Sequence, residues 1–233
     1  MFDKFGSWKP LVMSTSLAGE VEDLSDQIDI LYENTIVYPE KDKIFRVFEE
    51  CKYDDVKVVI LGQDPYPNIY NDKPSACGIA FATENGFINP SLRIIFKELS
   101  RSNLGIWGNP VVQGKQLINW CNQGVLMLNT ALTVEHGKAG SHAKMWSRFT
   151  ENLITSLSKE KRDLIWLLMG KHAQAYKENI VSGEIINIPH PMVDVYSGKD
   201  VFVGSNIFLR INDILIKQNK TPINWSNKPD DYE

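Results

Sequence analysis

The sequence predicts an α/β domain in which helices cover both faces of a parallel sheet. Two observations carry this prediction. Four short apolar runs are nearly continuous rather than alternating, which is typical of parallel strands buried on both faces. Segments with helical spacing separate these runs. The chain has 233 residues, 43% of them hydrophobic and 23% charged, so it can bury one large core, and its composition disfavours disorder and coiled coils.

The four predicted strands are short, rich in β-branched or large residues, and followed by glycine, asparagine or proline. They are Val56–Leu61, Gly124–Leu128, Asp163–Met169 and Glu184–Ile188. Because a residue pattern that is apolar throughout has no solvent-facing side, we expect both faces of these strands to be buried.

Helices are predicted before, between and after the strands. Apolar residues at positions i, i+3, i+4 and i+7 predict one over Ser91–Leu99, with Pro90 before it and Ser91 as its cap. A longer one is predicted over Lys144–Ser158, with Trp146 on its core face. The other predicted helices are Glu20–Tyr32, Lys41–Glu50, Lys115–Cys121, Lys171–Ile180 and Ile207–Gln218.

The charge is unevenly distributed along the chain. The net charge of −4 by itself argues against a nucleic-acid partner. However, residues 1–55 hold thirteen acidic and six basic residues, whereas residues 56–229 hold thirteen acidic and nineteen basic ones. The body of the chain is therefore mildly basic, which permits an anionic substrate. We predict a single domain over residues 1–233, with an acidic N-terminal helical segment (about 1–55) and a short acidic C-terminal tail (226–233).

Three well-separated cysteines, Cys51, Cys77 and Cys121, form no CxxC pair, which suits a reducing compartment and argues against zinc. We expect them to be small buried hydrophobic residues. The histidines show no HExxH or HxH spacing, so no metal is expected. No apolar run approaches the roughly 18 residues of a membrane span, and the first residues lack a signal-peptide pattern. The predicted location is the cytoplasm, or the nucleus in a eukaryote, without membrane association.

Ligands of open α/β sheets bind beyond the carboxyl ends of the strands, so the loops there are the candidate site. Those loops are Gly62–Pro67, Asn129–Thr130, Gly170–Lys171 and Pro189–Pro191. They bring together a carboxylate, an amide, a Gly-Lys turn and a histidine. Tyr66 and Phe81 add aromatic surfaces nearby. Such a pocket suits a flat polar ring.

Each candidate also has a purely structural interpretation. Asp64 precedes a proline, and Asp-Pro commonly opens a turn. His190 lies between two prolines, which fix the backbone, yet it could be an ordinary surface or core histidine. Phe81 could belong to the core or form a stacking platform. Of the remaining histidines, His142 is the stronger candidate, for a supporting role behind the site.

Four segments of the chain match a known pattern when taken together. They are GQDPYP at Gly62–Pro67, PSL at Pro90–Leu92, LNTALTV at Leu128–Val134 with GSH at Gly140–His142, and HP at His190–Pro191 with VY at Val195–Tyr196. They resemble, in order, the water-activating, proline-rich, uracil-reading and DNA-intercalation segments of family 1 uracil-DNA glycosylases. The similarity runs from about Trp8 to Trp225. It implies a central four-stranded parallel sheet and a repair enzyme that excises uracil from DNA, leaving an abasic site and free uracil, without a cofactor.

The resemblance also implies a role for each site residue. Asp64 would position water and offset positive charge on the sugar, and His190 would hydrogen-bond uracil O2 as negative charge grows there. The implied uracil-binding residues are Gln63, which lines the pocket, Tyr66, which stands against C5, Phe81, which stacks on the ring, and Asn129, which reads the Watson–Crick edge. One side-chain amide can donate to O4 and accept from N3, whereas cytosine presents the opposite pattern.

The implied DNA-binding residues are Pro90, Ser91, Gly170, Lys171, Pro191, Met192 and Val193. Several differ from the family pattern. Lys171 stands where the family has serine, although lysine can still meet a phosphate as a point charge. The loop after His190 is one residue shorter, so Met192 or Val193 would be the wedge. Asp194 in this loop would repel a phosphate. Pro67 replaces the usual histidine, and residues 68–77 form a longer segment than usual.

Two other functions fit the same fold. One is a catalytically weak replication-accessory or DNA-binding protein, whose acidic N-terminal segment makes protein contacts; the presence of both Asp64 and His190 disfavours it. The other is a glycosylase for a different damaged base, which Tyr66 and Asn129 together disfavour. The expected partners are uracil-containing DNA and, in addition, a proteinaceous inhibitor or replication proteins. We expect a monomer.

Overall fold

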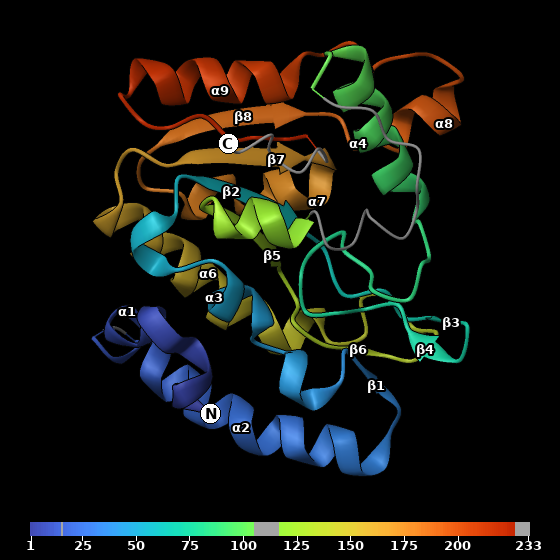
Figure 1. Cartoon of the computed structure of the whole chain (residues 1–233). Helices are drawn as coiled ribbons and strands as arrows, with labels where there is room; N and C mark the ends of the chain where they lie inside the picture. Colours follow the sequence, from blue (N-terminus) through green and yellow to red (C-terminus); the bar gives the residue numbers. More distant parts are fainter. Residues whose placement is uncertain (15, 105–116, 227–233) are drawn as a thin grey trace, which may run out of the picture.

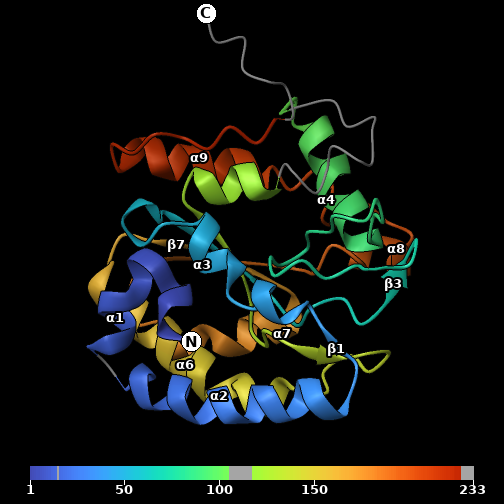
Figure 2. The ribbon, with the colours of Figure 1, turned by 60° about the horizontal axis from the view of Figure 1, so that its bottom comes forward.

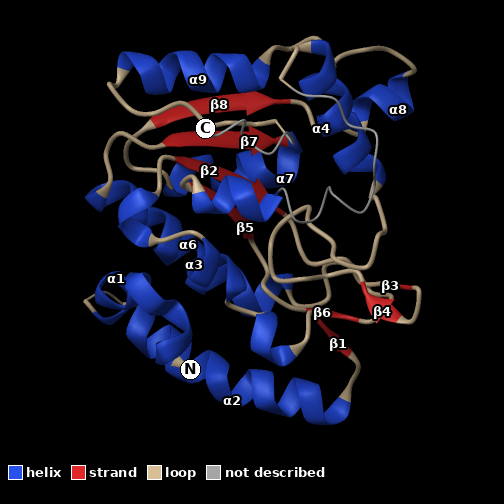
Figure 3. Cartoon of the chain, viewed as in Figure 1, coloured by secondary structure: helices blue, strands red, loops and turns tan. Residues whose placement is uncertain are grey.

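A four-stranded parallel sheet forms the centre of the computed structural model, which describes residues 1–14, 16–104 and 117–226 (Figure 1). The strand order is β5 (Val125–Asn129), β2 (Val58–Gly62), β7 (Ile165–Met169) and β8 (Glu184–Ile188). Figure 3 shows these strands in red with helices around them. The predicted α/β fold with a four-stranded parallel sheet is confirmed.

Burial explains why the strands could be predicted. Every residue of β2, β5 and β7 is buried, as expected for continuous apolar runs. The β8 strand lies at one end of the strand order and is only partly covered. Its Glu184 and Asn187 are exposed, whereas Ile186 and Ile188 are buried. This strand therefore alternates, unlike the other three.

Most predicted helices are present. Those with close counterparts are α2 (Leu17–Asn34), α4 (Pro90–Arg101), α6 (Ala143–Glu160) and α9 (Ile207–Lys217). Two predicted helices are divided: Lys41–Glu50 into η2 (Lys41–Lys43) and α3 (Arg46–Glu50), and Lys171–Ile180 into α7 (Gly170–Gln174) and the 3-10 helix η4 (Ala175–Asn179). Residues 117–122 are helical, whereas Lys115 and residue 116 lie outside the described residues, as does the acidic tail beyond Ser226.

The prediction that Ser91 caps its helix is wrong. The side chain of Asn89 accepts a hydrogen bond of 2.9 Å from the backbone N–H of Ser91, and Pro90 is the first helical residue. This arrangement follows the usual preferences, because asparagine is a strong cap and proline has no N–H to leave unsatisfied. Ser91 is therefore free of the capping role.

Several short elements were not predicted, because two-residue strands and five-residue helices show too little periodicity. They are η1 (Phe2–Trp8), α1 (Lys9–Met13), η3 (Tyr53–Asp55), α8 (Val193–Ser197), the pair β1 (Val37–Tyr38) with β6 (Val134–Glu135), and the hairpin β3 (Ile69–Tyr70) with β4 (Lys73–Pro74). The hairpin lies within residues 68–77. Its turn residues Asn71 and Asp72 both have positive φ, which tight hairpins require.

One cluster of buried residues extends from Phe5 to Trp225. Trp146 is fully buried in it, as predicted. Figure 2 shows α9 beside the helix at 117–122, where the rings of Trp120 and Phe208 lie 6.0 Å apart. The three cysteines are free and buried, which confirms their predicted role. Burial raises the pKa of the Cys77 thiol to about 11 and that of the Cys121 thiol to about 12.

Candidate active site

A cavity of about 230 Å³ lies where loops from the carboxyl ends of the central strands meet. In Figure 1 these strand ends point to the right, toward the side that carries α4, α8 and the β3–β4 hairpin. The cavity brings together both predicted catalytic residues, Asp64 and His190, with all four predicted uracil-binding residues. Those four are Gln63, Tyr66, Phe81 and Asn129.

Asp64 follows β2 and is half-buried. The backbone N–H of Gly140 donates a hydrogen bond of 2.5 Å to its Oδ2 atom. Gly140 has a φ of +76°, a conformation that glycine adopts without strain. Burial raises the pKa of Asp64, and this effect exceeds the lowering by the Gly140 hydrogen bond and by the charge of His172. The carboxylate is thus held in place in a surrounding that makes it more basic than usual.

His190 follows β8, and its ring orientation is set by its own loop. The backbone N–H of Met192 donates to His190 Nδ1 over 3.2 Å, so Nδ1 accepts and the neutral ring carries its proton on Nε2. Burial lowers the pKa of His190, which keeps the ring neutral near neutral pH. The ring is therefore a neutral donor through Nε2–H.

Gly170, at the end of β7, makes room for this histidine. It has a φ of +84°, and a Cβ added there would lie 2.7 Å from Cβ of His190. Any other residue would combine a strained backbone with a collision. The Gly-Lys turn of the sequence is thus a close-approach position for the imidazole of His190.

Asn129 ends β5 and pairs in register with Gly62 at the end of β2. It is 7% exposed, and its side chain lies directly on the glycine. A Cβ at Gly62 would lie 2.3 Å from Oδ1 of Asn129 and 2.9 Å from Cβ of Ala80. Because Gly62 has no side chain, the amide of Asn129 can occupy this position in the cavity.

Tyr66 and Phe81 form the aromatic part of the cavity. The Tyr66 hydroxyl donates to the backbone carbonyl of Phe81 over 3.2 Å. Phe81 has a φ of +65°, which is rare for a bulky residue and typical of functional sites. The hydrogen bond links the two aromatic residues, so their spacing is set by the fold rather than by a ligand.

The predicted DNA-binding residues divide between two neighbouring cavities. Ser91 is 8% exposed and lines the first one. A second cavity of about 460 Å³ shares His190 with the first and is lined, among others, by Gly170, Lys171, Met192 and Val193. Pro90, which is exposed, and Pro191, which is buried, line neither cavity.

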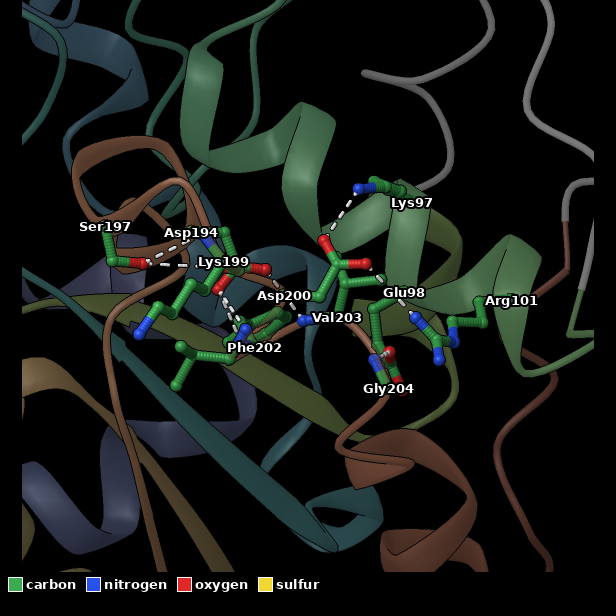
Figure 4. Close-up of polar contacts among 11 residues, drawn as sticks. Lys97, Glu98, Arg101, Asp194, Ser197, Lys199, Asp200, Phe202, Val203 and Gly204 are labelled. Carbon is green, nitrogen blue, oxygen red and sulfur yellow. Dashed lines mark hydrogen bonds and ion pairs between the residues drawn. The ribbon is translucent and has the colours of Figure 1, made fainter.

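The expectation that Asp194 would repel a phosphate stays a prediction, but the contacts of Asp194 show that its carboxylate is not free in the loop. Asp194 is 8% exposed, and its carboxylate turns toward the following loop (Figure 4). It accepts hydrogen bonds from the backbone N–H groups of Val201, Phe202 and Val203, at 2.8, 2.6 and 2.9 Å. Burial raises the pKa of Asp194, but these three bonds outweigh it, so the pKa is lowered overall. The negative charge of Asp194 is therefore stabilised by three backbone N–H groups.

A second carboxylate, Glu98 of α4, reaches the same loop from the other side (Figure 4). It is fully buried and accepts from the backbone N–H of Gly204 and, over 2.9 Å, from the Ser102 hydroxyl. On the surface, Lys97 and Arg101 form ion pairs of 2.9 and 3.2 Å with Asp200. The loop after α8 is therefore tied to α4.

Three further residues at the site were not selected from the sequence. His172 lines the cavity, Thr130 lies behind it, and Gly140 holds Asp64. His172 follows Gly170-Lys171 at a strand end, a position that could have identified it. Gly140 gave only a weak signal, because it acts through its backbone. His142 is buried and hydrogen-bonded to Thr133 over 3.0 Å and does not line the cavity, so its supporting role stays a prediction.

Within residues 1–14, 16–104 and 117–226, no group of three or more histidine, cysteine, aspartate or glutamate residues could hold a metal ion. Nor does that part of the chain contain a helix long and apolar enough to span a membrane.

Comparisons with known proteins agree with this geometry. The family model of the Uracil DNA glycosylase superfamily matches residues 48–204. A uracil-DNA glycosylase of Exiguobacterium sibiricum is 42% identical over 87% of this chain and 90% of the relative, and that of Bacillus subtilis is 39% identical over 89% of each. The crystal structure of mimivirus uracil-DNA glycosylase has a TM-score of 0.81 at 28% identity, covering 94% of this chain and 86% of its own. The chain therefore belongs to the uracil-DNA glycosylase superfamily.

Proposed function

We propose that this uracil-DNA glycosylase cleaves the N-glycosidic bond of a flipped-out uracil with Asp64 and His190 as its catalytic residues. One observation carries the proposal: a carboxylate and a neutral imidazole line the same small cavity as an amide that can read uracil. The duplex hides the glycosidic bond, so the base must leave the stack to reach such a cavity. The comparisons do not favour an accessory or merely DNA-binding protein, because uracil-DNA glycosylases match most of the chain.

The proposed chemistry follows from the charges that bond cleavage creates. The bond between C1′ and N1 breaks with both electrons going to uracil, which leaves cationic character on the sugar. The Asp64 carboxylate offsets that positive charge and orients a water molecule, whose oxygen bonds to C1′. The Nε2–H of His190 donates to uracil O2 as negative charge develops there. The proton lost by the water balances the uracil anion, giving free uracil and an abasic site.

Release of uracil from a single-stranded and a duplex oligonucleotide tests this proposal. We expect free uracil from uracil-containing strands and no free base from matched strands with thymine or cytosine in its place. Equal release from the cytosine strand would contradict the role of Asn129, because the amide could not pair with both bases.

Base selection rests on Tyr66 in this proposal. Tyr66→Ala removes the ring that stands against C5, so thymine should enter and be excised weakly. The measurement is abasic-site formation in ordinary DNA. Tyr70→Ala is the matched control, because Tyr70 is exposed on the hairpin and lines neither cavity. A folded Tyr66→Ala variant that excises uracil yet forms no new abasic sites would rule out the steric gate.

We propose that the chain contacts DNA through Pro90, Ser91, Gly170, Lys171, Pro191, Met192 and Val193. Lys171 is exposed and is the one full positive charge in this group. Each neutralised phosphate contributes a slope of about −0.9 to a log–log plot of duplex affinity against salt, and about −0.7 for single strands. Lys171→Ala should therefore flatten the slope by roughly one contact.

Affinity for a uracil-containing duplex, measured across a salt series, checks this expectation. Ser91→Ala should weaken binding with little change in slope, since a hydroxyl carries no charge. Lys159→Ala is the matched control, because Lys159 is exposed at the far end of α6 and outside both cavities. A Lys171→Ala variant with the parent's slope would show that this lysine contacts no phosphate.

Partners, location and domain organisation remain predictions. A variant of mimivirus UNG, 26% identical to this chain with a TM-score of 0.81, was solved in complex with UGI. A proteinaceous inhibitor of the present chain is proposed by analogy, alongside replication proteins. The proposal also includes a single domain over residues 1–233, a monomer and a cytoplasmic location. The three free cysteines of the described chain and the bacterial relatives support the cytoplasmic location.

A further inference from the structure

A second imidazole lines the catalytic cavity and has no part in the chemistry above. It belongs to His172, the third residue of α7. This histidine lines the cavity together with residues of the loop after β2. Its ring meets that of Tyr176 edge-on, with 5.9 Å between centroids. The cavity therefore contains one carboxylate, Asp64, and two imidazoles, His172 and His190.

The hydrogen bonds of His172 fix which ring nitrogen carries the proton. Its Nε2 lies 2.8 Å from the Thr130 hydroxyl oxygen, and that hydroxyl donates over 2.8 Å to the backbone carbonyl of Gln63. A carbonyl oxygen can only accept, and threonine has a single hydroxyl proton. Thr130 must therefore give its proton to Gln63 and accept from His172. In the neutral ring the proton is on Nε2, and Nδ1 keeps its lone pair.

This chain of hydrogen bonds ends on the peptide unit that carries Asp64. The carbonyl of Gln63 belongs to the peptide bond whose nitrogen is that of Asp64, and it also accepts from the backbone N–H of Ala131 over 2.9 Å. The Gly140 N–H fixes the carboxylate at the other end of the residue. Backbone and side chain of Asp64 are thus held separately, and His172 contributes to the backbone anchor.

We propose that His172 is a positioning residue for Asp64: as a neutral imidazole it anchors the Gln63–Asp64 peptide through Thr130, and its protonation places a positive charge beside the carboxylate and the developing sugar cation. The proposal rests on the proposed catalytic role of Asp64. A neutral ring helps the reaction twice, because it holds the loop and leaves the negative charge of Asp64 unopposed.

The charges around this ring are consistent with a neutral state. Burial lowers the pKa of His172, and this effect exceeds the raising by the nearby Asp64 carboxylate. The other titratable groups near the ring are Tyr176, whose hydroxyl meets Thr130, His190 across the cavity, and Lys171, the preceding residue of α7. As pH falls, protonation of His172 should therefore add to the loss of activity that protonation of Asp64 causes.

Four variants test the anchor by single-turnover uracil release. His172→Ala should lower the rate on the order of tenfold, within the range for coupled members of one hydrogen-bond network. Thr130→Val, which removes the bridging hydroxyl, should lower it similarly. His172→Gln keeps an N–H donor near the Nε2 position and should recover most of the rate. The matched control is His136→Ala, because His136 is exposed and lines neither cavity.

A double-mutant cycle separates positioning from general damage to the fold. If His172 acts through Asp64, adding His172→Ala to Asp64→Asn should cost almost nothing further in rate. Affinity for uracil-containing DNA in that background should also stay unchanged. In the His172→Gln variant the acid side of the pH–rate profile should become less steep, because one titrating group is gone.

Three results would overturn the proposal: a His172→Ala rate within twofold of the parent, a His172→Gln rate as low as that of His172→Ala, or full loss from His172→Ala in the Asp64→Asn background. Should His172→Ala fail to fold, Thr130→Val and His172→Gln decide alone. Failure of the catalytic assignment looks different, because Asp64→Asn itself would then keep the parental rate.

Discussion

Asp64→Asn should lower the single-turnover rate of uracil release by about two to four powers of ten, the range for a positioned catalytic group. The substitution keeps the shape of the side chain, and its Oδ1 can still accept from the N–H of Gly140. It removes the negative charge that offsets the sugar cation. Affinity for uracil-containing DNA should survive, because the residues that read the base are unchanged.

The pH dependence of the parent enzyme belongs to the same prediction. Burial raises the pKa of Asp64, so the carboxyl takes up its proton at a higher pH than an exposed aspartate does. The rate should fall as pH drops through this raised pKa, and Asp64→Asn should lack that part of the fall. A near-parental rate in Asp64→Asn would show that the carboxylate is not part of the chemistry.

His190→Ala should lower the same rate by about two to three powers of ten, the usual cost of losing one oxyanion donor. The donor is Nε2–H, since Nδ1 is occupied by the N–H of Met192. Burial lowers the pKa of His190, so the rate should show no requirement for a charged imidazole near neutral pH. Single-turnover kinetics and uracil-DNA affinity, measured together, distinguish lost chemistry from lost binding.

Gly170→Ala tests the role of His190 without removing the histidine side chain. Its Cβ would press on Cβ of His190, displacing the imidazole from the cavity. The rate should fall in the same direction as in His190→Ala, but less steeply. Parental kinetics in both variants would remove His190 from the mechanism, whereas parental kinetics in Gly170→Ala alone would show that the loop adapts.

The sequence predicted the parts of this protein that follow from periodicity and from strand ends. The strands β2, β5 and β7 are buried throughout, so their apolar runs identified them. Because parallel strands end at one edge of a sheet, the loop residues Asp64, Asn129 and His190 could be expected to converge. The four strands were predicted from their apolar runs, whereas the individual roles of the site residues came from the family resemblance.

What the sequence could not predict depends on which neighbour a polar group finds. Asp194 looks like a free loop charge, but it closes onto backbone amides seven to nine residues further on. Asn89 rather than Ser91 caps α4, although both are good caps. The ring tautomers of His172 and His190 are set by Thr130 and by a backbone N–H, partners that no residue pattern reveals.

The two buried carboxylates of Figure 4 have a mechanical consequence. Asp194 and Glu98 grip consecutive amides of the stretch 201–204 from opposite sides, so α8 and α4 cannot move independently. Ser91 is the second residue of α4, and Met192 directly precedes α8. The distance between the starts of these two helices is therefore set by hydrogen bonds within the protein itself.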